Sequence, residues 1–112
     1  MLFGIPYLKE NVPNYHAEAL SSLQTLYLFQ KDYRAAHGTY ARSLAELGVP
    51  LGAELVGERL RWDRYTFEIT DLTADSAGHV IGYRIIAQPM KLGKRGYVID
   101  QSGNFKPLVE TR

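Results

Sequence analysis

Residues 14–37 contain neither glycine nor proline and are rich in residues that favour an α-helix. Asn14 is a suitable N-cap residue, and Gly38 is a typical residue to follow the last helical turn. Arg34 and His37 place positive charge in the last turn, where the helix dipole favours it. The sequence therefore predicts one long helix over residues 14–37, and the rest of the chain must pack against it.

The apolar side chains of this helix gather on one side when successive residues are turned by about 100°. The predicted core face consists of Ala19, Leu20, Leu23, Leu26, Tyr27, Phe29 and Tyr33. Leu28 points to the opposite side, among polar residues. A single leucine on a helix surface is common, but it also suits a helix that has a second neighbour.

The hydrophobic period changes from helical to alternating after the first half of the chain. "ARSLAELG" (41–48) predicts a short helix or a single turn, and residues 49–58 predict a loop or irregular crossover because they contain two glycines and a proline. Strands are predicted over 65–70, 80–89, 96–100 and 105–109, with 60–64 as a candidate backward extension of the first. Residues 71–79, 91–95 and 101–104 have the composition of turns.

The predicted strands follow one another with short polar connections, which favours an antiparallel meander of three or four strands. Tyr65, Phe67, Tyr83 and Tyr97 are expected to be neighbours in its core. Pro107 suits an edge strand because proline cannot donate to a ladder. The fold class is therefore α+β, with the long helix on one face of the sheet. We expect a single domain over residues 14–112, preceded by an apolar segment at 1–13.

Composition excludes several kinds of protein. Thirteen basic and twelve acidic residues give a net charge of +1, so the strong positive field typical of nucleic-acid-binding proteins is not expected. The chain has no cysteine, which excludes disulfides and thiolate metal sites. No apolar run reaches about 18 residues, so we expect the chain itself to be soluble.

No arrangement of residues typical of an active site is present. Motifs such as HExxH and GxSxG do not occur, and the three histidines are far apart in the sequence. Asp71 and Asp75 lack the spacing of a calcium loop, and "DQSGN" (100–104) is most simply a turn. We therefore expect no enzyme activity, no catalytic residues, no cofactor and no metal, and calcium at either loop remains the less favoured alternative.

The order of segments in this chain is similar to that of type IV pilins and type II secretion pseudopilins. That family has a long helix with small, polar and aromatic residues at set positions, then a glycine, a tyrosine and a short "SLAELG"-like segment. The matching residues are Ala19, Ser22, Leu23, Thr25, Gln30, Tyr33, Gly38, Tyr40, Ser43, Leu44 and Leu47. "YTFEIT", "GYRIIAQP" and "RGYVIDQSGNF" resemble the meander strands of pilin-like domains.

The resemblance implies a non-enzymatic structural subunit that assembles with other pilin or pseudopilin subunits through its N-terminal helix. It also implies a place in the cell envelope, as an inner-membrane-anchored periplasmic or extracellular filament. "GIPYL" (4–8) resembles the end of the family's membrane helix, so residues 1–13 are expected to be either a remnant of that anchor or the native start of the chain. The leader and peptidase site of the family do not occur in this chain. The residues expected to take part in self-association are Phe3, Ile5, Tyr7, Leu8 and Leu28.

A second function class remains open, namely a pilin-like binding module for a partner protein or, less favoured, a nucleic acid. Two polar connections are the candidate binding loops in that case. Their candidate residues are Asp71, Asp75, His79, Lys91, Lys94 and Arg95.

Overall fold

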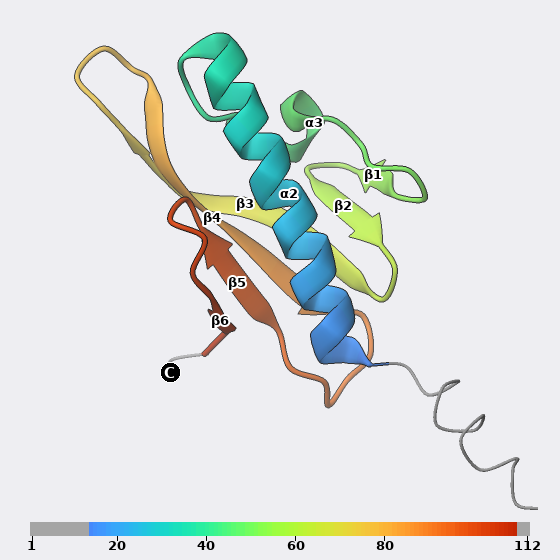
Figure 1. Ribbon diagram of the computed structural model, residues 1–112. Helices are drawn as coiled ribbons and strands as arrows, with labels where there is room; N and C mark the ends of the chain where they lie inside the picture. Colours follow the sequence, from blue (N-terminus) through green and yellow to red (C-terminus); the bar gives the residue numbers. More distant parts are fainter. Residues whose placement is uncertain (1–13, 110–112) are drawn as a thin grey trace, which may run out of the picture.

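The computed structural model describes residues 14–109, which form a long helix packed on one face of an antiparallel sheet (Figure 1). The helices are α2 (Tyr15–His37) and α3 (Leu44–Leu47). The strands are β1 (Glu54–Val56), β2 (Arg59–Trp62), β3 (Tyr65–Ala74), β4 (Val80–Pro89), β5 (Tyr97–Asp100) and β6 (Phe105–Pro107). Their order in the sheet is β1-β2-β3-β4-β5-β6, so the predicted α+β meander is confirmed.

Both predicted ends of α2 are confirmed. The side chain of Asn14 accepts a hydrogen bond from the backbone N–H of Ala17 at 3.0 Å. Gly38 has a φ of 77°, and its N–H donates to the carbonyl of Arg34. The helix ends here because Gly38 adopts a left-handed conformation, in which a non-glycine residue would be strained.

The buried side of α2 differs from the predicted core face. The fully buried positions are Ala19, Ser22, Leu23, Leu26 and Gln30, whereas Leu20, Tyr27, Phe29 and Tyr33 are only partly buried. Two polar residues therefore lie in the buried stripe. Each has a hydrogen-bond partner outside the helix, which makes its burial tolerable.

Gln30 connects α2 to the chain that follows it. Its side-chain amide donates to the carbonyl of Ala41 at 3.1 Å and accepts from the N–H of the same residue at 2.8 Å. The side chain is completely buried. The residue before Ala41 contacts the sheet, since the N–H of Tyr40 donates to the carbonyl of Val80 at the start of β4. These bonds fix the crossover between the helix and the sheet.

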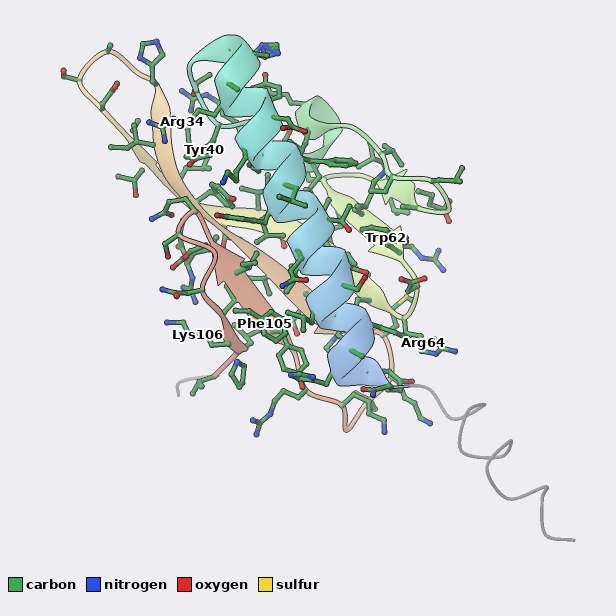
Figure 2. The ribbon with its side chains drawn as sticks, in the orientation of Figure 1. Arg34, Tyr40, Trp62, Arg64, Phe105 and Lys106 are labelled. Atoms are coloured by element: carbon green, nitrogen blue, oxygen red, sulfur yellow. The ribbon has the colours of Figure 1, made fainter. Side chains whose placement is uncertain are left out.

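The end of α2 is also held from the side. The guanidinium of Arg34 donates to the hydroxyl of Tyr40 at 3.2 Å and lies 5.0 Å from the centre of its ring (Figure 2). The ring of Tyr40 packs edge-on against Tyr83 of β4, with their centroids 4.9 Å apart. The aromatic residue after the helix stop therefore belongs to the core.

Alternate residues of the central strands face the helix, as predicted. In β4 the buried residues include Tyr83, Ile85 and Ala87, while Ile86 lies on the other face. The predicted core aromatics Tyr65, Phe67, Tyr83 and Tyr97 are all buried. Antiparallel pairing sets these residues side by side, since Phe67 pairs with Ala87 and Ala87 pairs with Tyr97.

The sheet has six strands rather than three or four, because residues 54–56 and 59–62 form two further strands. β1 and β2 form a tight hairpin around Gly57, whose φ is 67°. β2 then turns into β3 at Asp63, which has a φ of 56°, so residues 60–64 do not simply extend β3. Strands of three or four residues are too short to show a clear alternation, and their turn residues resemble loop composition.

β3 is longer than predicted and continues through residues 71–74. The pairing register shifts between Thr70 and Thr73, and Asp71 between them has a φ of 53°. Such an irregularity breaks the alternation that marks a strand in the sequence. Residues 71–79 are all exposed, and Figure 1 shows the β3–β4 hairpin projecting past the rest of the sheet. These residues do not contact the core, so the end of β3 carries no alternation of apolar side chains that could mark it as a strand.

Candidate functional site

Leu28 lies on the side of α2 that faces away from the sheet. Its side chain is 55% exposed, and its helical neighbours Gln24, Lys31 and Ala35 are exposed as well. The predicted orientation of Leu28 is therefore confirmed, while its part in self-association stays a prediction. The other predicted self-association residues, Phe3, Ile5, Tyr7 and Leu8, lie outside the described residues.

The first candidate binding loop is the exposed tip of the β3–β4 hairpin. The carboxylate of Asp75 accepts hydrogen bonds from the N–H groups of His79 and Ala77, at 2.9 and 3.0 Å, and these bonds lower its pKa. The imidazole Nδ1 of His79 lies 3.5 Å from the same carboxylate. Asp71 is held by Arg84, which donates to it at 2.9 Å. The acidic groups of this loop are thus occupied in shaping the hairpin.

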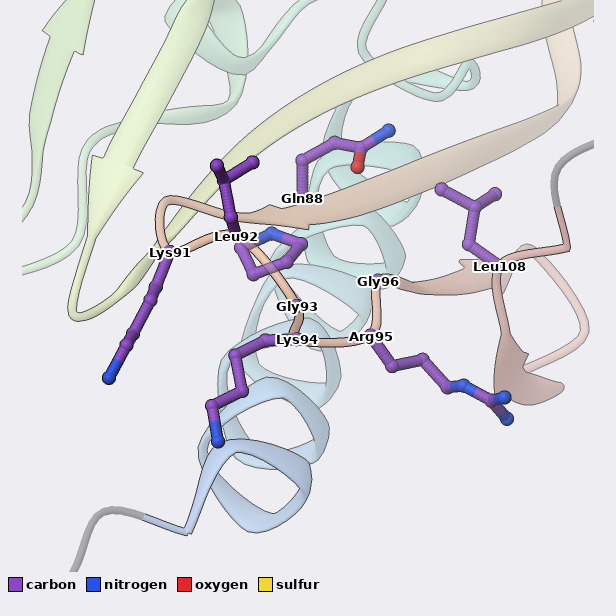
Figure 3. A pocket seen from close by; sticks show the side chains of 9 residues that line it. Gln88, Lys91, Leu92, Gly93, Lys94, Arg95, Gly96 and Leu108 are labelled. Carbon is purple, nitrogen blue, oxygen red and sulfur yellow. The ribbon is translucent and has the colours of Figure 1, made fainter.

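The second candidate binding loop is the basic connection between β4 and β5 (Figure 3). Residues 91–95 are all exposed, and the loop borders a cavity of about 360 Å³. Gln88, Leu92 and Leu108 also line this cavity. In Figure 3 the side chain of Lys94 extends toward the first turn of α2, while the side chains of Lys91 and Arg95 extend to opposite sides of it.

The two loops lie at opposite ends of β4. This strand has ten residues and therefore spans roughly 33 Å. The structure does not bring Asp71, Asp75 and His79 together with the basic residues of 91–95. A single small ligand cannot contact both groups.

Two residues that were not among the predicted site residues join the basic connection to the start of α2. The hydroxyl of Tyr65 lies 3.2 Å from the carbonyl of Tyr15 and 3.4 Å from that of Arg95. Arg64 donates to Glu18 at 2.6 Å, and its backbone carbonyl accepts from Met90. Burial is the main cause that raises the pKa of Tyr65 to about 12, so its hydroxyl stays protonated. The sequence indicates neither contact, since Tyr65 is predicted only as a core residue and Arg64 is one of three arginines within residues 59–64.

The turn at 100–104 has the self-contained hydrogen bonding that its composition predicted. The carboxylate of Asp100 accepts from the N–H and hydroxyl of Ser102 and from the N–H of Asn104. Gly103 has a φ of 85°, and a Cβ at this position would lie 3.3 Å from the ring of Tyr27. The turn therefore packs closely against α2. Partial burial acts to raise the pKa of Asp100, but the bonds from Ser102 and Asn104 outweigh it and lower the pKa.

We expect Asp100→Asn to lower the stability of the domain at neutral pH and to reduce its dependence on acid pH. Because the folded-state pKa is depressed, the carboxylate stabilises the fold above the unfolded pKa of about 3.9. That contribution is lost as pH falls through the lower folded-state value. The measurement is the free energy of unfolding in urea, for the wild type and the variant, from neutral pH to below the folded-state pKa. Equal pH profiles for the wild type and the variant would contradict the assignment.

Among residues 14–109, no group of three or more histidine, aspartate or glutamate side chains is arranged to hold a metal ion. In the same part of the chain, no helix combines the length and apolar character needed to cross a bilayer. The chain matches no protein-family model, and neither the curated proteins nor the solved structures include one with significant similarity to it.

Proposed function

We propose that this chain is a non-enzymatic structural subunit, of the type IV pilin or type II secretion pseudopilin kind, that assembles through its N-terminal helix. The observation that supports the proposal is the two-sided character of α2. One side packs on the sheet through Leu23 and Leu26, and the opposite side exposes Leu28. A long helix with one core face and one exposed apolar position is suited to packing against a second helix.

The order of elements supports the same proposal. The sequence motifs that resemble pilins fall on the long helix, on the glycine that ends it and on the crossover that leads into the meander. At that junction the side chain of Gln30 binds the crossover and Gly38 ends the helix. The ring of Tyr40 packs in the core. In the proposed assembly α2 lies inside, the sheet and its loops face outward, and the subunit belongs to the cell envelope.

We expect Leu28→Asp to weaken self-association of the full chain by roughly 10- to 100-fold, because a buried leucine side chain contributes about 1.5–3 kcal/mol. Sedimentation velocity over a range of protein concentrations, in detergent micelles, measures the dissociation constant. Leu51→Asp is the matched control, since Leu51 is 99% exposed and lies outside the helix.

Two results would contradict the proposal. One is a wild-type chain that stays monomeric at every concentration. The other is an equal loss of association in the Leu28 and Leu51 variants, which would show that added charge rather than the helix face is responsible.

A further inference from the structure

The end of the domain at which α2 begins carries a cluster of exposed basic side chains, here called the basic end. It consists of Arg64, Lys91, Lys94 and Arg95. The cluster comes from two connections that are distant in the sequence, β2–β3 and β4–β5. They are joined by the hydrogen bond from the N–H of Met90 to the carbonyl of Arg64 at 3.0 Å. The clustering is therefore a product of the fold.

The acidic residues Glu18 and Asp63 also lie at this end, and Glu18 forms an ion pair with Arg64 of the cluster. Glu18 accepts from Arg64 at 2.6 Å, and Asp63 accepts from the hydroxyl of Ser22 at 3.3 Å. Within residues 14–109, no carboxylate forms an ion pair with the three basic residues of the β4–β5 connection. The chain as a whole has a net charge of only +1, so the positive charge here is local.

The basic end has a defined orientation relative to α2. The ammonium group of Lys94 lies 4.8 Å from the centre of the Tyr15 ring in the first turn of the helix. The carbonyl of Arg95 is bound through Tyr65 to the same turn. Leu92 points to the other side of the loop in Figure 3 and is not part of this surface.

The sequence before α2 has an apolar stretch at residues 1–8, followed by the polar segment "KENVPN" (9–14) that leads into the helix. Residues 1–8 contain no charged side chain, and the chain joins the domain at Asn14, beside the basic end. Anionic phospholipid headgroups attract clustered lysine and arginine side chains next to an apolar segment. A nucleic acid is less suited, since the basic residues form one compact group rather than a track along a backbone.

From this combination we infer that the basic end binds the anionic headgroups of a membrane surface directly. The contact holds the start of α2 against the bilayer and orients the sheet away from it. The inference does not depend on self-association, because each chain carries its own basic end. It concerns the folded domain, in addition to any anchoring by the segment before it.

Sedimentation of the full chain with vesicles tests the inference. One set of vesicles contains phosphatidylcholine with phosphatidylglycerol, and the other contains phosphatidylcholine alone. At about 0.1 M salt, where the Debye length is about 10 Å, we expect wild-type protein to prefer the anionic vesicles. Combined Lys91→Gln, Lys94→Gln and Arg95→Gln substitutions are expected to lower this binding by roughly 100-fold, since each basic residue near an anionic surface contributes about fivefold.

A matched variant, with Lys31→Gln, Arg42→Gln and Arg59→Gln, removes the same charge from other exposed positions. Its binding is expected to stay within about threefold of wild type, because charges farther than a Debye length are screened. Equal losses in the two variants, equal binding of wild type to neutral and anionic vesicles, or no binding to either would overturn the inference. So would displacement of the protein from vesicles by duplex DNA, which would reassign the surface to nucleic acid.

Discussion

Gln30→Leu is expected to lower the free energy of unfolding by about 2–5 kcal/mol. The substitution keeps a side chain of similar volume but removes both hydrogen bonds to Ala41. The N–H and carbonyl of Ala41 then remain buried without partners, and each such group costs about 1–3 kcal/mol. A domain of this size has a total stability of only about 5–15 kcal/mol, so the effect is large. Urea unfolding followed by circular dichroism measures it.

Gln24→Leu is the control for this experiment, because Gln24 is exposed on the same helix. We expect that variant to differ from wild type by less than about 0.5 kcal/mol. Amide hydrogen exchange at Ala41 gives an independent reading, since its protection is expected to fall selectively in Gln30→Leu. A stability change as small as that of the control would mean that the crossover does not depend on Gln30.

Phe67→Ala is expected to lower the free energy of unfolding by about 3–5 kcal/mol, because it leaves a cavity among the aromatic side chains of the core. Phe67 is completely buried in the core cluster. The rings of Trp62 and Tyr65 lie 6.0 and 6.1 Å from its own, centre to centre. Surrounding side chains are large and held by two strands, so they can collapse only partly into the space. Thermal and urea unfolding of the variant are the measurements.

Thr66→Ala tests the strand register in the same experiment. Thr66 is the preceding residue and lies on the opposite face of β3. Loss of strand propensity there is expected to cost at most about 1 kcal/mol. If the two substitutions had equal effects, the assignment of Tyr65 and Phe67 to the helix-facing side of β3 would be wrong.

Local patterns were sufficient where one segment carries its own signal. The limits of α2 were predictable because Asn14 and Gly38 are cap residues whose bonding is local. The facing of β4 was predictable because Tyr83, Ile85 and Ala87 alternate with partly or fully exposed residues. The turn at Asp100 was predictable for the same reason, since its carboxylate binds the next few residues.

The short strands and the buried polar residues were not predictable in this way. β1 and β2 have too few residues for a period, and their pairing depends on a neighbouring strand. The core position of Gln30 depends on a partner eleven residues away, whereas its own type suggests a solvent-facing position. The helical projection therefore placed the core face too far toward Tyr27 and Phe29.

The exposed side of α2 around Leu28 could be predicted from the sequence, whereas the basic end could not. Exposure of Leu28 followed from the helical period alone. The basic end did not, because Arg64 and Lys94 lie in separate connections and meet only when β2, β3 and β4 pair. The separation of the two candidate binding loops likewise follows from the length of β4.

The sequence by itself determined the fold class, the length and limits of α2, the alternating faces of the long strands and the turn at 100–104. These features depend on the conformational preferences of residues close together in the chain. Only the tertiary structure decided the number of strands, the burial of Gln30 and the grouping of basic side chains at the start of α2. Those features depend on contacts between distant residues, and such contacts are specified by packing and pairing across the whole domain rather than by any local pattern.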